Sequence, residues 1–536
     1  MKKRRGVAQV LIGLVLVAAL VLIPMACKAP EVPPVTPPAA PPAAPPVAPP
    51  EEVAPPEEVT PPTAPPVVEI KPFRGLADIP EIENKTPIHV AVESGAFAEL
   101  VKDQIDIFAE HTGIPVTYEA MMFASMYPKE NMELIAGTGA YDCNIMEGSW
   151  TNEWAPYIWN MDDLAEIYDP GGVAAFHKDL EGHSSSMLRC CSDRFGNLKG
   201  LPYFTYDMVQ FVRQDIFDDP IEKAAFEERY GYELAVPTAW AQVYDLAEFF
   251  TRKKGELLKG EPLAEDFYGT AMMAGRTQMN DEIATMIWAQ GGRYATLIRD
   301  EAGTPIEFVI TRKDKEALKE ALNLYKSLLQ FCSPGCINAH QEFVTAQFAG
   351  GLCAFVPQMY IPLEQWAATV ADTVPGAKLA LYLCPGNKGY TGNYSQAVAK
   401  ASRNPEASFW LARYISSYEC QKELAENVAG GGSGWGWASV RVDAYDDPKY
   451  EAPEWRIKTG MRADILNEIW SKYQTAKDVE TYLYFNTTAG GKIYEDHIII
   501  LHEGVTVLTP DQAIDRLVER TIDLQTKFGS LPMREE

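Results

Sequence analysis

The chain has 536 residues, of which 47% are hydrophobic and 11% are aromatic, and its formal net charge at pH 7 is -27. This length is too great for one simple core, so two or more lobes are expected. The excess of 74 acidic over 47 basic residues disfavours nucleic acid and anionic lipid headgroups as partners, and its simplest role is solubility.

The first 26 residues have the layout of a secretory signal. Four basic residues, Lys2 to Arg5, precede a mostly apolar, uncharged segment over 10–25, and the small Ala26 precedes Cys27. The layout resembles a bacterial lipoprotein signal, which implies a signal peptide over 1–26 and lipidation of Cys27. An uncleaved membrane helix is the alternative, although the apolar segment is slightly shorter than the ~20 residues of a bilayer span. Both place the remainder of the chain outside the membrane.

The next segment, 27–85, is expected to be an anchored, disordered tether. Residues 30–72 contain 18 of the 40 prolines, and most of their other residues are Ala, Val, Glu and Thr, which cannot build a core. In polyproline II geometry this part would reach about 130 Å. It is either a spacer of selected length through a cell wall or a simple linker.

Strands and helices alternate from residue 87 onward. Ile88–Glu93 has the alternation of a strand, a helical spacing of apolar residues follows up to Gly113, and "IPVTYEA" predicts a second strand. A helix over 127–137 leads to a third strand, "YDCNIME". Strand–helix–strand repetition predicts a parallel sheet with right-handed crossovers.

The same alternation continues toward the C-terminus. "MVQFVRQDIF" predicts a strand that runs into a helix, and further helices are expected after Pro237 and over 313–331. "GLCAFVP" (351–357) predicts a strand of small and apolar residues. Thr509 to Gln512 form a capping box with proline at the first helical position, which predicts the start of a final helix.

Eight cysteines follow Cys27, an even number that permits disulfides in an exported protein. Cys332 and Cys336 are the best local pair, because the Pro-Gly between them favours a turn. The sequence has no CxxC pair and no cluster of histidines, so no metal site is expected.

Six separated segments resemble, in order, conserved blocks of the extracellular solute-binding proteins of ABC importers, and the sugar-binding, maltose-binding-protein-like branch fits best. The segments are "GTGAYDCNIMEGSWTNEWA" (137–155), "GLPYFTYDMVQFVRQDIFDD" (200–219), "VPTAWAQVYDLAEFF" (236–250), "FVTAQFAGGLCAFVPQMY" (343–360), "AKASRNPEASFWLARYISS" (399–417) and "TPDQAIDRL" (509–517). Phe211 stands where the family usually has Tyr.

The resemblance implies an α/β fold, the two-lobed type II periplasmic-binding-protein fold, with a hinge and a ligand cleft between the lobes. Lobe 1 would comprise 86–206 plus 386–445, and lobe 2 would comprise 207–385 plus 446–528. It also implies an extracytoplasmic, lipid-anchored monomer that delivers a small solute to the permease subunits of an ABC importer, without a cofactor.

A sugar site needs flat aromatic faces and polar groups that orient hydroxyls, and in two-lobed α/β proteins it lies where strands end. On this basis, and on the family's crossing region and aromatic positions, the candidate ligand-binding residues are Glu93, Glu147, Trp150, Tyr203, Tyr206, Gln358, Tyr360, Trp435 and Trp437. Each has a structural alternative: the two glutamates could be solvated loop ends, and the aromatic residues could pack in a core. Trp435 and Trp437 alternate in a glycine-rich loop, so one is expected in the cleft and the other in the core.

Two other functions fit an exported, aromatic-rich chain. A secreted carbohydrate-active hydrolase would use two carboxylates, but the sequence lacks the G-x-S-x-G, G-x-x-x-x-G-K-[ST] and H-E-x-x-H motifs, and no catalytic residue is assigned. A sensory solute receptor would use the same cleft to signal. The expectation is a binding protein for a carbohydrate and not an enzyme.

Overall fold

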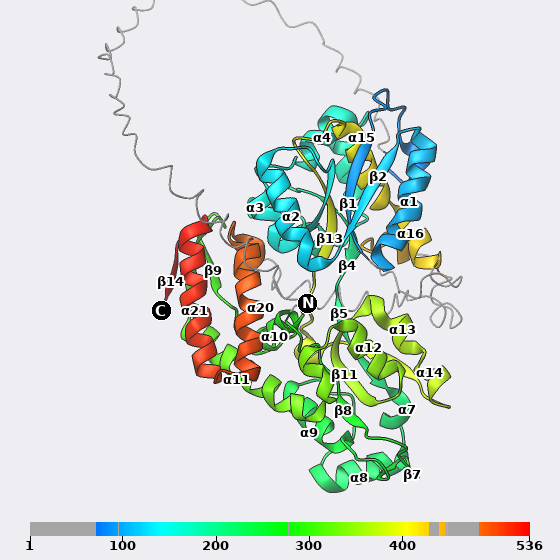
Figure 1. Cartoon of the computed structure of the whole chain (residues 1–536), viewed down its shortest axis with the longest axis vertical. Helices are drawn as coiled ribbons and strands as arrows, with labels where there is room; N and C mark the ends of the chain where they lie inside the picture. Colours follow the sequence, from blue (N-terminus) through cyan, green and yellow to red (C-terminus); the bar gives the residue numbers. More distant parts are fainter. Residues whose placement is uncertain (1–70, 95, 277, 428–438, 446–447, 449–481) are drawn as a thin grey trace, which may run out of the picture. The chain divides into compact units, whose positions relative to one another are not determined.

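The computed structural model describes residues 71–94, 96–276, 278–427, 439–445, 448 and 482–536. The predictions for the signal peptide, for Cys27 and for most of the tether therefore lie outside the described residues. In the described part, two main sheets carry the fold, and helices flank them (Figure 1).

The first sheet has five strands in the order β2-β1-β3-β13-β4. Their bounds are β1 Ile88–Glu93, β2 Val116–Met121, β3 Cys143–Glu147, β4 Leu201–Thr205 and β13 Asn393–Val398. β1 is parallel to β2 and β3, as the strand–helix–strand pattern predicted, but β13 is antiparallel to β3 and β4. The parallel prediction was therefore incomplete, because β13 enters this sheet after the chain has passed through the second one.

Helices α1 (Ala96–Thr112) and α15 (Pro405–Ile415) contact this sheet and each other. α1 ends where the sequence predicted, because Gly113 has a φ of 68°, a left-handed conformation that suits glycine. α2 (Phe123–Ala136) begins four residues before the predicted helix and contains Pro128. The earlier start brings the first turn of α2 next to the end of β2.

The second sheet has four strands in the order β12-β5-β11-β8. Their bounds are β5 Met208–Arg213, β8 Tyr268–Thr270, β11 Cys353–Tyr360 and β12 Leu379–Tyr382. β5 is antiparallel to β11 and β12, whereas β8 is parallel to β11. α9 (Trp240–Phe250) contacts β8 and β11, and α12 (Gln341–Ala349) contacts β11.

Four further helices pack beside the second sheet's core. α10 (Met279–Ala289) contacts α11 (Arg312–Leu328), and both contact α20 (Gly490–Thr506). α20 runs alongside α21 (Pro510–Phe528), in orange and red in Figure 1. The predicted capping box begins α21: Thr509 Oγ1 accepts a hydrogen bond from the Gln512 backbone N–H at 3.3 Å.

The remaining elements are short or peripheral. The helices are α3 Thr151–Trp154, α4 Met161–Tyr168, α5 Gly172–Leu180, α6 Ser185–Cys190, α7 Gln214–Phe217, α8 Pro220–Tyr230, α13 Glu364–Ala368, α14 Val370–Thr373 and α16 Tyr418–Asn427. The minor strands are β6 Leu257–Leu258, β7 Glu261–Pro262, β9 Thr296–Arg299, β10 Pro305–Ile310 and β14 Met533–Glu535. None of the described helices is both long enough and apolar enough to cross a membrane.

Each sheet has its own hydrophobic core. The first core includes Val90, Ile145, Trp154 and Trp410, and the second includes Phe211, Ile283 and Phe355. Burial of apolar surface is the main force that stabilises each core, at about 25 cal/mol per Å². Two separate cores give two units that can keep their internal packing while the angle between them changes.

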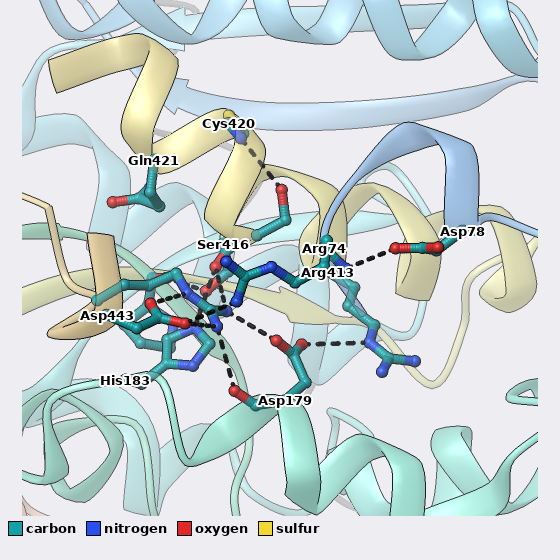
Figure 2. A network of polar contacts seen from close by, with 12 residues as sticks. Arg74, Asp78, Asp179, His183, Arg413, Ser416, Cys420, Gln421 and Asp443 are labelled. Atoms are coloured by element: carbon teal, nitrogen blue, oxygen red, sulfur yellow. Dashed lines mark hydrogen bonds and ion pairs between the residues drawn. The ribbon is translucent and has the colours of Figure 1, made fainter. Parts of the chain in front are cut away.

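A buried ionic network fastens the first core's outer helices together (Figure 2). Asp179 of α5 pairs with Arg441 at 2.8 Å and with Arg413 of α15 at 3.5 Å, and Arg413 also pairs with Asp169. Arg441 forms a second pair with Asp443 at 2.9 Å. The network ties two helices to the 439–445 segment, although these parts are far apart in the sequence.

Candidate functional site

Among the residues that the structure describes, two segments that connect the sheets lie side by side. The first passes from β4 to β5 through Tyr206 and Asp207, and the second reaches β13 through residues 390–392. The Tyr206 N–H donates to the Gly392 carbonyl at 2.8 Å, and Thr391 Oγ1 donates to Asp207 Oδ1 at 2.5 Å. Paired crossing segments of this kind form a hinge, because a few backbone angles there can reorient whole units.

A cavity of about 420 Å³ adjoins the hinge. Its size falls in the range of ~300–1,000 Å³ typical of small-molecule sites. Residues of both cores line it: Glu93, Ser94, Met122, Phe123, Ala124, Glu147, Tyr206, Gln278, Asp281, His340, Gln341, Glu342, Tyr360, Tyr390, Tyr394 and Tyr494. The cavity lies where β1, β3 and β11 end and where α2, α10 and α12 begin.

Two of the carboxyl groups in the cavity are held by tyrosines. Tyr206 Oη donates to Glu93 Oε2 at 3.3 Å, and Tyr394 also hydrogen-bonds to Glu93. Tyr360 Oη donates to Asp281 Oδ2 at 2.7 Å. Burial raises the pKa of each of these two carboxyls to about 7, since removal from water disfavours the charged form.

Glu147 and Glu342 add two more carboxyl groups. Glu147 ends β3 and caps the short helix after it, because its Oε2 accepts hydrogen bonds from the Ser149 N–H at 2.8 Å and from the Ser149 hydroxyl. Burial also raises the pKa of Glu147. Glu342, in the first turn of α12, is exposed.

Aromatic rings form much of the remaining wall. The Tyr206 ring contacts Tyr360 edge-on, with ring centroids 5.4 Å apart, and contacts Tyr394 edge-on at 5.0 Å. Tyr390, Tyr494 and Phe123 also line the cavity. Such rings can stack on the C–H faces of a sugar and can also attract a cation to their π faces.

The structure brings four of the predicted site residues together in the cavity wall: Glu93, Glu147, Tyr206 and Tyr360. The two glutamates lie at strand ends, where the sequence placed them. Tyr206 lies in the hinge, and Tyr360 is the last residue of β11.

Three other predicted residues do not line the cavity. Trp150 is 3% exposed and packs against Trp154, with ring centroids 5.1 Å apart. Tyr203 is 2% exposed within β4, and the fully buried Gln358 donates to the Glu282 carbonyl at 3.1 Å. The side chains of these three residues are buried in the interior and do not reach the cavity wall. Trp435 and Trp437 lie outside the described residues.

Several lining residues were not among the predicted site residues. Asp281 lies in the first turn of α10, Tyr390 lies in the second crossing segment, Tyr394 lies in β13, and Tyr494 lies in α20. The "GYTGNY" sequence around the crossing segment combines glycine with aromatic residues, and this pattern could have indicated Tyr390 and Tyr394 as site residues. Asp281 and Tyr494 belong to helices whose approach to the cavity depends on tertiary packing.

The predicted disulfide is not formed in the structure. Cys332 and Cys336 are buried free thiols, as are the other six described cysteines. Cys332 Sγ hydrogen-bonds to the Leu328 carbonyl at 3.6 Å, and a hydrogen bond from Cys332 lowers the pKa of Cys336 to about 7. The turn expected from Pro-Gly is instead a short 3-10 helix, Pro334–Asn338.

The sequence matches a model of a known protein family. The model described as "Bacterial extracellular solute-binding protein" matches residues 91–422, which is more than half of the chain. A search of curated proteins finds no match.

Solved structures with the same fold cover most of the chain. Maltose-bound MalE3 of T. maritima is 16% identical over 83% of this chain and 100% of its own, with a TM-score of 0.58. An ABC transporter solute-binding protein of Agrobacterium radiobacter K84 in complex with ribitol is 16% identical over 83% and 99%, with a TM-score of 0.60. One from Thermotoga lettingae TMO bound to alpha-D-tagatose is 17% identical over 82% and 100%, with a TM-score of 0.57.

Proposed function

The chain belongs to the bacterial extracellular solute-binding proteins, the solute-binding proteins of ABC transporters, and we propose that its solute is a carbohydrate or polyol held in the cavity beside the hinge. The observation that carries this proposal is the wall of tyrosines and hydrogen-bonding carboxyls between two separately packed cores. Aromatic faces and polar groups in one cavity suit a ring that has apolar faces and hydroxyl edges. The sugars and the polyol bound by the three structural neighbours support the same class.

The proposed cycle uses the hinge. The solute binds between lobe 1 (86–206 plus 386–445) and lobe 2 (207–385 plus 446–528), and closure buries it against both. A solute that contacts both lobes favours the closed state by its differential affinity for that state. The closed form then presents a new outer surface to the permease subunits of an ABC importer.

Anchoring completes the proposal. Lipidation at Cys27 after removal of 1–26 would keep a monomeric receptor at the membrane, on the outer side where the family acts. The proline-rich tether over 27–85 would give it reach toward the transporter. Mass spectrometry of the protein from a bacterial host with lipoprotein processing would detect a diacylglyceryl-modified N-terminal Cys27.

A thermal-shift screen tests the solute class. Neutral sugars, amino sugars and polyols are added to the purified protein, and a true ligand raises the unfolding midpoint because it binds only the folded state. We expect at least one member of these classes to raise it in a saturable manner. A shift with peptides or organic acids alone would contradict the carbohydrate proposal, and steady turnover of a bound sugar would contradict a purely binding role.

A further inference from the structure

The charge of the cavity wall narrows the identity of the solute beyond the class proposed above. Four carboxyl groups line the cavity: Glu93, Glu147, Asp281 and Glu342. Among the described lining residues, none is Lys or Arg, and the one side chain with a basic group is His340. Carboxylates also accept hydrogen bonds from neutral hydroxyl groups, but an excess of four carboxyls over lysine and arginine in one wall favours a cation in addition.

The carboxyls oppose one another across the two cores. Glu93 ends β1 of the first sheet and is repelled by Glu342 of α12, which packs beside the second sheet. Asp281 of α10 is likewise repelled by Glu147 at the end of β3. Each pair therefore takes one member from each core, and approach of the cores brings like charges together.

Helix ends do not cancel this charge. Asp281 and Glu342 lie in the first turns of α10 and α12, and Glu147 caps a short 3-10 helix. A helix N-terminus contributes only about half of a positive charge. Glu93 lies at the end of a strand. Burial still raises the pKa of Glu93, Glu147 and Asp281, so the surrounding dipoles do not fully stabilise the carboxylates.

The tyrosine rings of the cavity wall also favour binding of an organic cation. The Tyr206, Tyr360 and Tyr394 rings lie next to the Glu93 and Asp281 carboxyls, which accept their hydroxyl hydrogen bonds. An ammonium group is attracted to tyrosine π faces as well as to carboxylates. Gln278 and Gln341 also line the cavity; Gln278 Oε1 accepts a hydrogen bond from the Gln341 N–H, and Gln341 Nε2 donates to Glu342 Oε1.

We propose that the solute carries at least one protonated amine, which the facing carboxylates of Glu93, Glu147 and Asp281 bind together with the tyrosine rings. An amino sugar or amino polyol has both the ammonium group and the hydroxylated frame. This inference rests on the proposed function, namely that the cavity is the solute site. The family match and the cavity support this site, and the charge of its wall supports the choice of ligand.

Matched ligands test the inference by calorimetric titration at pH 7.5. Glucosamine, galactosamine, mannosamine and chitobiose are each compared with the neutral parent sugar and with the N-acetylated form, and putrescine and spermidine serve as amines without a sugar frame. We expect an amine to bind at least tenfold tighter than its neutral and N-acetylated counterparts. Equal or tighter binding of the neutral or acetylated forms overturns the inference and leaves the carbohydrate proposal intact.

The other outcomes are equally decisive. Binding of polyamines without any sugar supports the amine and overturns the carbohydrate proposal. If no amine in the panel binds, the inference is wrong, whatever the neutral sugars do.

Variants of the cavity carboxyls test whether these groups cause the preference for an amine. Glu93→Gln and Asp281→Asn should reduce the ratio of amine to neutral-sugar affinity by at least tenfold, whereas Glu301→Gln, at an exposed turn away from the cavity, should leave it unchanged. The amine affinity of the wild type should also rise between pH 5 and pH 7, because the cavity carboxyls ionise over this range while the ligand keeps its ammonium group. A ratio that is unchanged in both cavity variants overturns the inference.

Discussion

At the scale of single residues, the hydrogen bond from Tyr360 to Asp281 affects the charge of the cavity wall. Its length is 2.7 Å, and it stabilises the ionised carboxylate, which opposes the effect of burial on the pKa of Asp281. The hydroxyl therefore keeps a larger fraction of Asp281 charged near neutral pH than burial alone would allow.

Tyr360→Phe removes this bond and should weaken binding of an amine ligand by about tenfold, which corresponds to ~1.4 kcal/mol. The reason is twofold: the pKa of Asp281 rises further, and the carboxylate loses an orienting partner. Calorimetry at pH 7 measures the change. Tyr203→Phe is the matched control, since Tyr203 is buried outside the cavity wall. A larger loss in the control than in Tyr360→Phe would contradict the assignment.

The predicted residues that line the cavity are those whose positions follow from local sequence pattern. Glu93 and Glu147 are the last residues of two predicted strands, and Tyr206 and Tyr360 belong to segments that resemble the family's blocks. Gln358 was assigned to the site because it lies near the end of the same strand as Tyr360, but it faces α10 and bonds to Glu282 there. Asp281 has no local signal, because its place in the wall depends on how α10 packs.

At the scale of elements, the Asp179 network shows how distant segments are held together (Figure 2). Asp179 and Arg441 are almost fully buried, and so is Arg413. Burial of charges is costly, and removal of one partner leaves the others uncompensated.

Asp179→Asn should lower the free energy of unfolding by about 3–5 kcal/mol, because two buried arginines lose their shared carboxylate. Lys178→Gln, on the same helix, removes an exposed ion pair with Glu181 and should cost less than about 1 kcal/mol. Urea denaturation compares the two variants. Equal losses in the free energy of unfolding would contradict the expectation that the buried Asp179 network stabilises the fold more than an exposed ion pair does.

The helices and strands that the sequence predicted have local signals. The capping box at Thr509 and the left-handed Gly113 fix the ends of two helices. The antiparallel direction of β13 could not be predicted from its own residues. It depends on the path of the chain, which enters this strand from the second sheet. The Pro-Gly signal did bring Cys332 and Cys336 close enough for their thiols to hydrogen-bond, although both thiols are free in the structure.

Thr509→Ala should lower the free energy of unfolding by about 1 kcal/mol, because the side chain satisfies an N–H of the first turn of α21. Thr509→Ser keeps the hydroxyl and should cost much less. Both values come from urea titration. Equal losses in the two variants would show that the cap does not stabilise α21.

At the scale of the whole molecule, the cavity carboxyls make the stability of the ligand-free protein depend on pH. The pKa of Asp281 rises from its ordinary value of 3.8 to about 7, so between these values the folded state binds more protons than the unfolded state. Stability from this group is fully present below pH 3.8 and is lost as pH rises to about 7.

Asp281→Asn should therefore remove part of the decline in stability between pH 4 and pH 7, by up to about 4 kcal/mol at neutral pH. Urea titrations at several pH values, with Glu301→Gln as a control, measure the difference. A variant whose pH profile is parallel to that of the wild type would show that Asp281 does not titrate in this range.

The central claim is that the solute binds in the cavity beside the hinge, and blocking the cavity tests it most directly. Ala124 is an exposed lining residue in the first turn of α2, and Ala302 is an exposed residue of a turn away from the cavity. The Kd of the tightest ligand from the sugar and amine panel is measured by calorimetry for Ala124→Trp, Ala302→Trp and the wild type. We predict at least tenfold weaker binding to Ala124→Trp alone, and equal affinity of all three proteins would contradict the claim.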